Sequence, residues 1–235
     1  MAAFDLGIAA GADGLELDVH LSADGVLVVH HDDMLDRTTN ATGPLAKLTA
    51  AELARVDAGY RFAGRGDFPF RNRGIGIPAL RDVLPRYPDV RIIIEMKVDT
   101  REMGEAVMRE VRTAGAAERV CLGGFGRRSA ATVRAGMPEV VTSACAREVH
   151  LAVYRSWVRW PVTHVPYQAY QVPEKYRGLR VVSPRWLCES HDAGLKVQVW
   201  TVDAEPDMRR LLAWGVDGLI SNRPDLAVQV RDAVA

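Results

Sequence analysis

Three carboxylates lie inside two apolar runs, where a charge is unfavourable without a partner. Glu16 and Asp18 stand two positions apart in "GLELDV", and Glu95 precedes Lys97 by two positions in "RIIIEMK". Because successive strand side chains point to opposite faces, the members of each pair share a face. Converging carboxylates repel one another unless a cation lies between them, and hard oxygen ligands suit Mg²⁺ or Ca²⁺. The pattern predicts a divalent-metal site; the alternative is a set of ion pairs from the acids to Lys97 and Arg37.

Two adjacent histidines, His30 and His31, end the apolar run "VLVVHH". Their side chains point to opposite faces of a strand, so only one of them can face a site at its end. The alternative is that both are solvated surface residues. The polar loop "DRTT" (36–39) follows, and its hydroxyls and cation could meet a phosphate, although many ordinary loops have this composition.

Strand-like apolar runs alternate with helical patterns along the whole chain, which favours a parallel sheet. The architecture predicted is a TIM (β/α)8 barrel, a single domain over residues 1–235 with an excursion at about 20–78. Seven barrel strands can be counted, so one strand is missing at the N-terminal end. The C-terminal ends of parallel barrel strands carry the active site, and both acidic pairs lie there. The seven strands are expected near residues 15, 93, 121, 141, 168, 199 and 219.

Composition excludes several classes of function. Lys plus Arg equals Asp plus Glu, 30 against 30, so neither nucleic acid nor an anionic membrane is expected as a partner. No apolar run is long enough for stable membrane insertion, and the first residues lack the pattern of a signal peptide. The start resembles the body of a helix without a cap. The three scattered cysteines indicate reduced thiols and a cytoplasmic protein: Cys121, Cys145 and Cys188.

Five segments occur in an order that resembles the glycerophosphodiester phosphodiesterase family. They are "GADGLELDVHLSADGVLVVHHDDMLDRTTNATG", "IPALRDVL", "IIIEMK", "VQVWTVD" and "GVDGLISNRP", spread from the start to about residue 224. The resemblance implies a TIM barrel that hydrolyses glycerophosphodiesters, which are small molecules, to glycerol 3-phosphate and an alcohol. It also implies one divalent cation, Ca²⁺ or Mg²⁺, as cofactor.

The resemblance assigns roles to individual positions of this chain. Glu16, Asp18 and Glu95 match the family's metal ligands, and His31 matches one of its two catalytic histidines. His30 then falls on the other face of the strand and is structural.

Three further positions match the family's substrate-binding residues. Lys97 corresponds to a phosphate contact, and Trp200 to an aromatic that lines the pocket for the glycerol or the leaving group. Phe125 in "GGF" resembles another aromatic of the same wall, as a looser match. The alternative for Trp200 is ordinary barrel packing.

The chain also departs from the family pattern. A strand with His-Arg-Gly and a loop with Pro-Glu-Asn-Thr open the family's barrel, and neither is present here. They supply the second acid/base histidine, a phosphate-binding arginine and a glutamate near the metal. The departure suggests that Met1 is an internal methionine or the edge of a fragment. Three alternatives to the active enzyme therefore remain: a truncated, inactive metal-binding barrel, a phospholipase D-like relative, or another metal-dependent barrel enzyme such as an aldolase.

Overall fold

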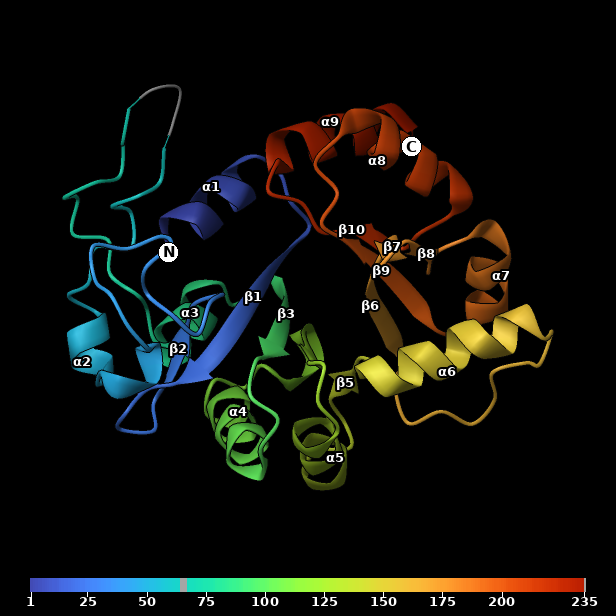
Figure 1. The fold of residues 1–235 in the computed structure, drawn as a ribbon, viewed down its shortest axis with the longest axis horizontal. Coiled ribbons are helices and arrows are strands. Elements are labelled where there is room, and N and C mark those ends of the chain that lie inside the picture. The colour runs from blue at the N-terminus through green and yellow to red at the C-terminus, as the bar shows by residue number, and fades with distance from the viewer. Residues whose placement is uncertain (64–66, 235) are drawn as a thin grey trace.

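The computed structural model describes residues 1–63 and 67–234, and it forms the predicted curved arrangement of parallel strands surrounded by helices (Figure 1). Neighbouring strands pair in the orders β1-β3-β4-β5 and β6-β9-β10, and all of these pairs are parallel. A parallel bridge between Ser143 and Ala169 joins the two groups. The seven predicted strands are thereby confirmed: β1 Gly14–Leu21, β3 Arg91–Met96, β4 Val120–Gly123, β5 Val141–Thr142, β6 Ala169–Pro173, β9 Lys196–Trp200 and β10 Gly218–Leu219.

Eight helices of the described chain cover the outside of the strands. Helix α4 illustrates why they form: Thr100 caps it by accepting a hydrogen bond from the Met103 amide at 3.2 Å, and Met103, Val107 and Val111 bury one face. This face packs against the apolar side of β1 and β3. The helices are α1 Ala2–Ala9, α3 Leu80–Arg86, α4 Arg101–Thr113, α5 Arg127–Gly136, α6 Ala146–Trp157, α7 Pro184–Asp192, α8 Glu205–Trp214 and α9 Pro224–Val234. None of the described helices combines the length and apolar character that a bilayer crossing demands.

The expected excursion leaves the barrel after β1. Strand β2 (Leu27–Val29) pairs antiparallel with the end of β1, and the 3₁₀ helix Leu45–Lys47 and helix α2 (Ala50–Leu53) follow. Thr49 and Glu52 form a capping box at the start of α2. The helix ends at Leu53, after which the Arg55 and Val56 amides donate to carbonyls three residues back, those of Glu52 and Leu53.

The barrel is open between β1 and β10. Strand β1 pairs with β2 and β3, whereas β10 pairs only with β9, and no strand of the described chain lies between β1 and β10. This is the place at which the sequence predicts a missing strand. Side chains connect the two sides: an Arg231 guanidinium nitrogen lies 3.1 Å from the Gly11 carbonyl oxygen and 2.7 Å from the Asp13 carboxylate.

Two separate apolar cores fill the space between the barrel strands and their helices, and a third, smaller one lies within the excursion. The first contains the odd-numbered side chains of β1, such as Leu17 and Val19, together with β3, α3 and α4. The second contains Tyr170, Trp186 and Val199 and lies around β6, β9, α7 and α8. The acidic residues of interest therefore lie in one half of the barrel, and Trp200 lies in the other.

Candidate active site

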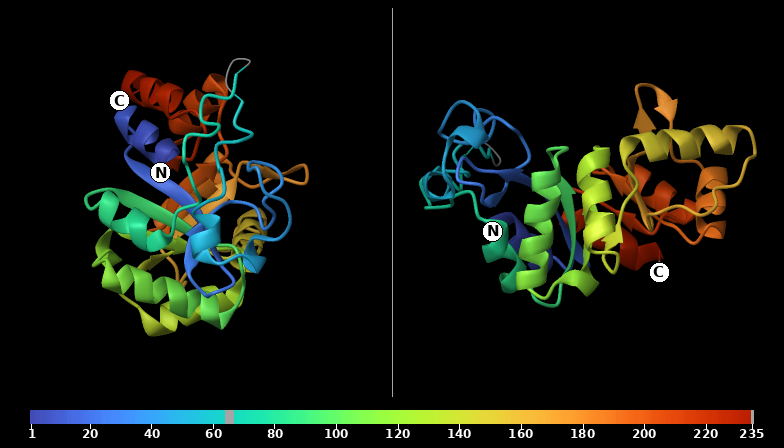
Figure 2. Two further views of the ribbon diagram at one scale, coloured as in Figure 1. Left: turned by 90° about the vertical axis from the view of Figure 1, so that its left-hand side faces the viewer. Right: turned by 90° about the horizontal axis from the view of Figure 1, so that it is seen from below.

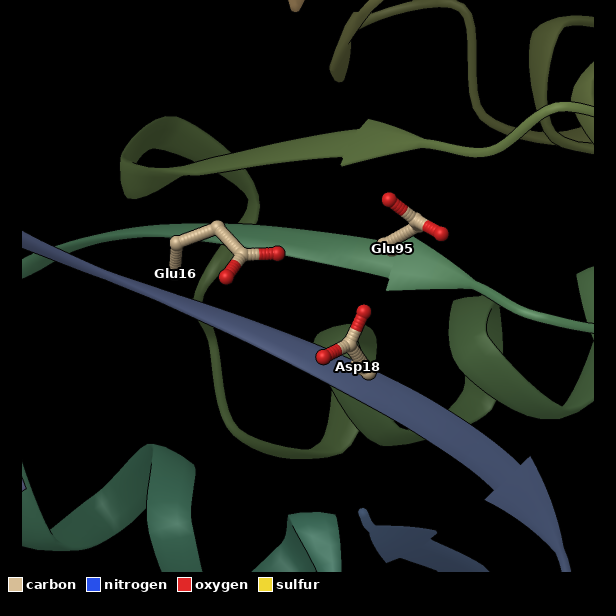
Figure 3. A group of neighbouring side chains, drawn as sticks. All are labelled: Glu16, Asp18 and Glu95. Carbon is tan, nitrogen blue, oxygen red and sulfur yellow. The ribbon is translucent and has the colours of Figure 1, made fainter. Parts of the chain in front are cut away.

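Three carboxylates converge on one face of β1 and β3 (Figure 3). Glu95 lies near the C-terminal end of β3 as expected, whereas Glu16 and Asp18 lie within β1, because β1 continues to Leu21. Leu15, Leu17 and Val19 are buried in the first core, so the even-numbered side chains of β1 turn to the opposite face. Asp18 is the register partner of Glu95 across the parallel pair. One ligand oxygen from each of Glu16, Asp18 and Glu95 lies within 4.8 Å of the others. The structure thus brings together the three acids that the sequence predicts to meet.

The Lys97 side chain lies against two of these acids. Its ammonium Nζ is 2.8 Å from Asp18 Oδ1 and 2.8 Å from Glu95 Oε1. Burial opposes the charge of Lys97, but the two hydrogen bonds outweigh it and raise the pKa of the ammonium. Arg37 takes no part: its guanidinium pairs with Asp32 instead, at 2.6 Å. The alternative prediction of acid ion pairs is therefore right for Lys97 and wrong for Arg37, because Arg37 lies in the loop after β2.

Glu16 is the acid of the cluster that Lys97 does not contact. Within the described residues, its carboxylate has neither a hydrogen bond nor an ion pair. Burial raises its pKa to about 8, and the nearby charges of Asp18 and Glu95 add to this shift. When all three acids are ionised, one ammonium faces three carboxylates. A divalent cation with oxygen ligands fits this donor set, because it supplies the positive charge that Lys97 alone does not.

The backbone of His31 lies beside the C-terminal end of β1. His20 Nε2 is 3.2 Å from the carbonyl oxygen of His31, which fixes the backbone there, and the His31 side chain is exposed. Its Nδ1 lies 2.7 Å from Asp32 Oδ1, and the Arg37 guanidinium holds the pKa of Asp32 well below its usual range. An ionised carboxylate on Nδ1 leaves Nε2 free for proton transfer, the arrangement found for catalytic histidines.

The other two histidines of this region face away from solvent. His30 is half-buried, its buried Nε2 has no hydrogen-bond partner among the described residues, and burial lowers its pKa. His20 was not singled out from the sequence, although it follows Glu16 and Asp18 at intervals of two. That alternation was the available signal, and it indicates a side chain on the acidic face of β1.

Trp200 and Phe125 lie together on the other side of the acids. Their rings are edge to face, with centroids 6.2 Å apart. Both line a groove of about 310 Å³ that Glu95 also lines. The arrangement offers a charged centre for a phosphoryl group next to an aromatic wall. Such pairing suits an anionic ester that carries a less polar substituent.

A comparison with protein families identifies the family of this chain. The model of the glycerophosphoryl diester phosphodiesterase family matches residues 1–226. The chain belongs to this family. The resemblance drawn from the sequence is confirmed, and with it the assignment to the phosphodiesterases and the TIM-barrel fold.

Relatives within the phosphodiesterase family match nearly the full chain. A glycerophosphodiester phosphodiesterase of Caldanaerobacter subterraneus is 28% identical over 236 residues, which cover 98% of this chain and 90% of that protein. A glycerophosphodiester phosphodiesterase of Bacillus subtilis is 30% identical, with 94% and 77% covered. The crystal structure of the Agrobacterium tumefaciens phosphodiesterase is 29% identical, covers 98% of this chain and 91% of its own, and superimposes with a TM-score of 0.77.

Proposed function

We propose that this phosphodiesterase hydrolyses glycerophosphodiesters to glycerol 3-phosphate and an alcohol, with one divalent cation, Ca²⁺ or Mg²⁺, held by Glu16, Asp18 and Glu95. The observation that carries the proposal is the convergence of these three carboxylates within 4.8 Å on one face of β1 and β3, with a single ammonium beside them. Bound there, the cation neutralises the phosphodiester and stabilises charge on the phosphoryl oxygens during displacement. The names of the 28–30% identical relatives support the substrate class.

The reaction replaces one phosphorus–oxygen bond by another. The oxygen of a water molecule, or of the substrate's own glycerol hydroxyl, forms a bond to phosphorus while the bond to the alcohol oxygen breaks. The nucleophile loses one proton and the leaving alkoxide gains one. If the glycerol hydroxyl attacks first, water then opens the cyclic ester, and the products are the same.

The chain's own side chains divide this work. The Lys97 ammonium lies at the cluster, hydrogen-bonded to Asp18 and Glu95. In the proposed reaction it exchanges these contacts for one to a phosphoryl oxygen. His31, oriented by Asp32, moves a proton at its Nε2. Trp200 and Phe125 form the wall against which the glycerol or the leaving alcohol packs. The three cysteines are free thiols, which supports a reducing, cytoplasmic setting.

The experiment is a measurement of glycerol 3-phosphate release from glycerophosphocholine by the purified protein. Activity should disappear with a chelator and return on addition of Ca²⁺ or Mg²⁺. Asp18→Asn should abolish it, whereas Asp89→Asn, at an exposed position away from the site, should leave it unchanged. Activity that persists in the chelator would exclude the metal-dependent mechanism.

Two other functions expected from the sequence serve as outcomes of the same assay. A truncated, inactive barrel would bind the cation without releasing any product. A phospholipase D-like relative would act on lysophospholipids or sphingomyelin and leave glycerophosphocholine untouched. The open side of the barrel between β1 and β10 is the feature that favours the inactive barrel.

A further inference from the structure

An apolar groove extends from the acidic cluster along helix α6. One side is a stripe of α6 side chains at helical spacing, and the other is the hairpin of β7 (Lys175–Tyr176) and β8 (Leu179–Arg180). The hairpin projects from the barrel beside α6 (Figure 2). The walls are formed by Val149, Val153, Tyr154, Trp157, Tyr176 and Leu179.

The inner end of the groove is the proposed reaction centre itself. Glu95, Phe125 and Trp200 line the same hollow as the α6 stripe. The twelve residues of α6 span about 18 Å, so the groove wall continues well beyond the space that glycerol or choline requires. A ligand with its phosphoryl group at the acids would therefore extend along this wall.

The lining of the groove selects an uncharged occupant. Beyond Glu95 at the inner end, Arg180 at the hairpin is the one other Asp, Glu, Lys or Arg among the lining residues. Trp157 is 59% exposed and Leu179 is 58% exposed. Large apolar side chains that face each other across an open groove gain free energy when an apolar ligand removes them from water.

We propose that this groove is a subsite for an alkyl or acyl chain attached to the phosphodiester. The substrate class then includes single-chain amphiphiles, with the chain either on the leaving alcohol or on the glycerol. The inference rests on the proposed phosphodiesterase function, which supplies the phosphoryl group at the inner end. The alkyl or acyl chain itself undergoes no reaction, so the bonds made and broken are those of the hydrolysis described above.

The test compares substrates that differ only in chain length. Ethyl, butyl, hexyl and octyl esters of glycerol 3-phosphate, and short-chain 1-acyl glycerophosphocholines, are assayed below the concentration at which micelles form. Each methylene that enters the groove should raise kcat/KM by up to about fourfold, the ratio expected for burying one methylene. A rise in either series supports the subsite and shows on which side of the phosphorus the chain lies. Equal kcat/KM along both series would overturn it.

Matched variants test whether the alkyl chain of the ligand lies against α6 and the β7–β8 hairpin. Leu179→Ser and Trp157→Ala should each lower kcat/KM for the octyl ester about tenfold while changing the ethyl ester less than about twofold. Leu151→Ser and Trp160→Ala, which change exposed side chains that do not line the groove, should leave both unchanged. Equal losses on the ethyl and octyl esters would contradict the proposal.

A binding measurement separates failure of the subsite from failure of the proposed function. Calorimetry with the octyl and ethyl esters in the presence of a chelator reports the groove without requiring turnover. Tighter binding of the octyl ester that Leu179→Ser removes supports the subsite even if glycerophosphocholine is not hydrolysed. If the substitutions instead change only the self-association of the protein or its binding to vesicles, the groove has another occupant and the proposal is wrong.

Discussion

Asp18 and Glu95 are register partners on adjacent parallel strands, and one ammonium, that of Lys97, lies 2.8 Å from a carboxylate oxygen of each. The single positive charge of Lys97 balances only one of the two negative charges of Asp18 and Glu95. Glu16 adds a further acid without a partner of its own among the described residues. In the proposed cation site, a side chain thus already supplies part of the positive charge. A divalent ion bound there would compete with Lys97 for the same oxygens, which gives the first prediction.

Replacing Lys97 by Met should separate metal binding from catalysis. Removing the competing ammonium leaves the affinity for Ca²⁺ or Mg²⁺ equal or higher, because Asp18 and Glu95 lose an internal partner. The phosphoryl group loses a cationic contact, so kcat/KM on glycerophosphocholine should fall about 10²–10³-fold. Calorimetry and initial rates measure the two effects. Lys47→Met, at an exposed position, is the control, and a Lys97→Met enzyme as fast as its parent would reduce Lys97 to an ion-pair partner.

Asp18→Asn should weaken metal binding without a large change in fold. The amide keeps the shape of the side chain but removes one negative charge from the three-acid set, and Lys97 still pairs with Glu95. Calorimetric titration with Ca²⁺ and Mg²⁺ should show a marked loss of affinity relative to the parent protein. Asp89→Asn should titrate as the parent does. Equal binding by the parent and Asp18→Asn would remove the carboxylates from the metal assignment.

The stability of the metal-free protein should depend on pH through Glu16. Its pKa rises from an ordinary 4.5 to about 8 in the folded chain, so between these values the folded state holds a proton that the unfolded state has released. The free energy of unfolding therefore falls as pH rises through this window. Glu16→Gln should lack this fall. The measured quantity is the difference between the unfolding free energies of parent and variant at each pH. This difference removes the contributions of His20, His30 and the Met1 amine, whose pKa values burial lowers in both proteins.

The same linkage gives the pH dependence of metal binding. Below about pH 8, binding requires that Glu16 release its proton, so metal affinity should rise with pH and level off above that value. Thermal melts at several pH values, with and without Ca²⁺, measure both effects. If the metal-free parent and metal-free Glu16→Gln showed the same change of Tm with pH, Glu16 would not have the raised pKa.

His31→Gln should lower kcat by about 10²–10⁴-fold, the usual contribution of a positioned acid/base group. Metal affinity should not change, because the ring interacts with Asp32 rather than with the acidic cluster. The control is His164→Asn at an exposed position with φ of 52°, a backbone conformation that asparagine tolerates. Loss of activity in both variants, or in neither, would argue against the role of His31.

The sequence predicts most of this arrangement because its strongest signals are local. Alternation along "GLELDV" and "RIIIEMK" places the acids on the faces that the structure shows, and the β/α succession leads to the order of the strands. The pairing of Arg37 with Asp32 could not be predicted, since it depends on how the loop after β2 folds back.

The α6 groove also escaped prediction from the sequence. Along the chain, the aromatic stripe of α6 has the pattern of an ordinary amphipathic face that is buried on folding. Only the packing of the helix beside the β7–β8 hairpin shows that Trp157 and Leu179 stay partly exposed. Exposure is a tertiary property, so periodicity alone does not distinguish a core stripe from a binding surface.

The two apolar cores have a consequence for how the protein unfolds. Backbone pairing is interrupted between β1 and β10, and between β5 and β6 it consists of one bridge, with backbone hydrogen bonds Gln168 N to Thr142 O and Ala144 N to Ala169 O, both 2.9 Å. Each half therefore has its own core and few backbone ties to the other, which is the condition for separate cooperative units. A cation at the acids would slow amide exchange chiefly in the first half, and an alkyl chain in the groove chiefly in the second. A substrate that contacted both, as proposed above, would make the two halves open as one.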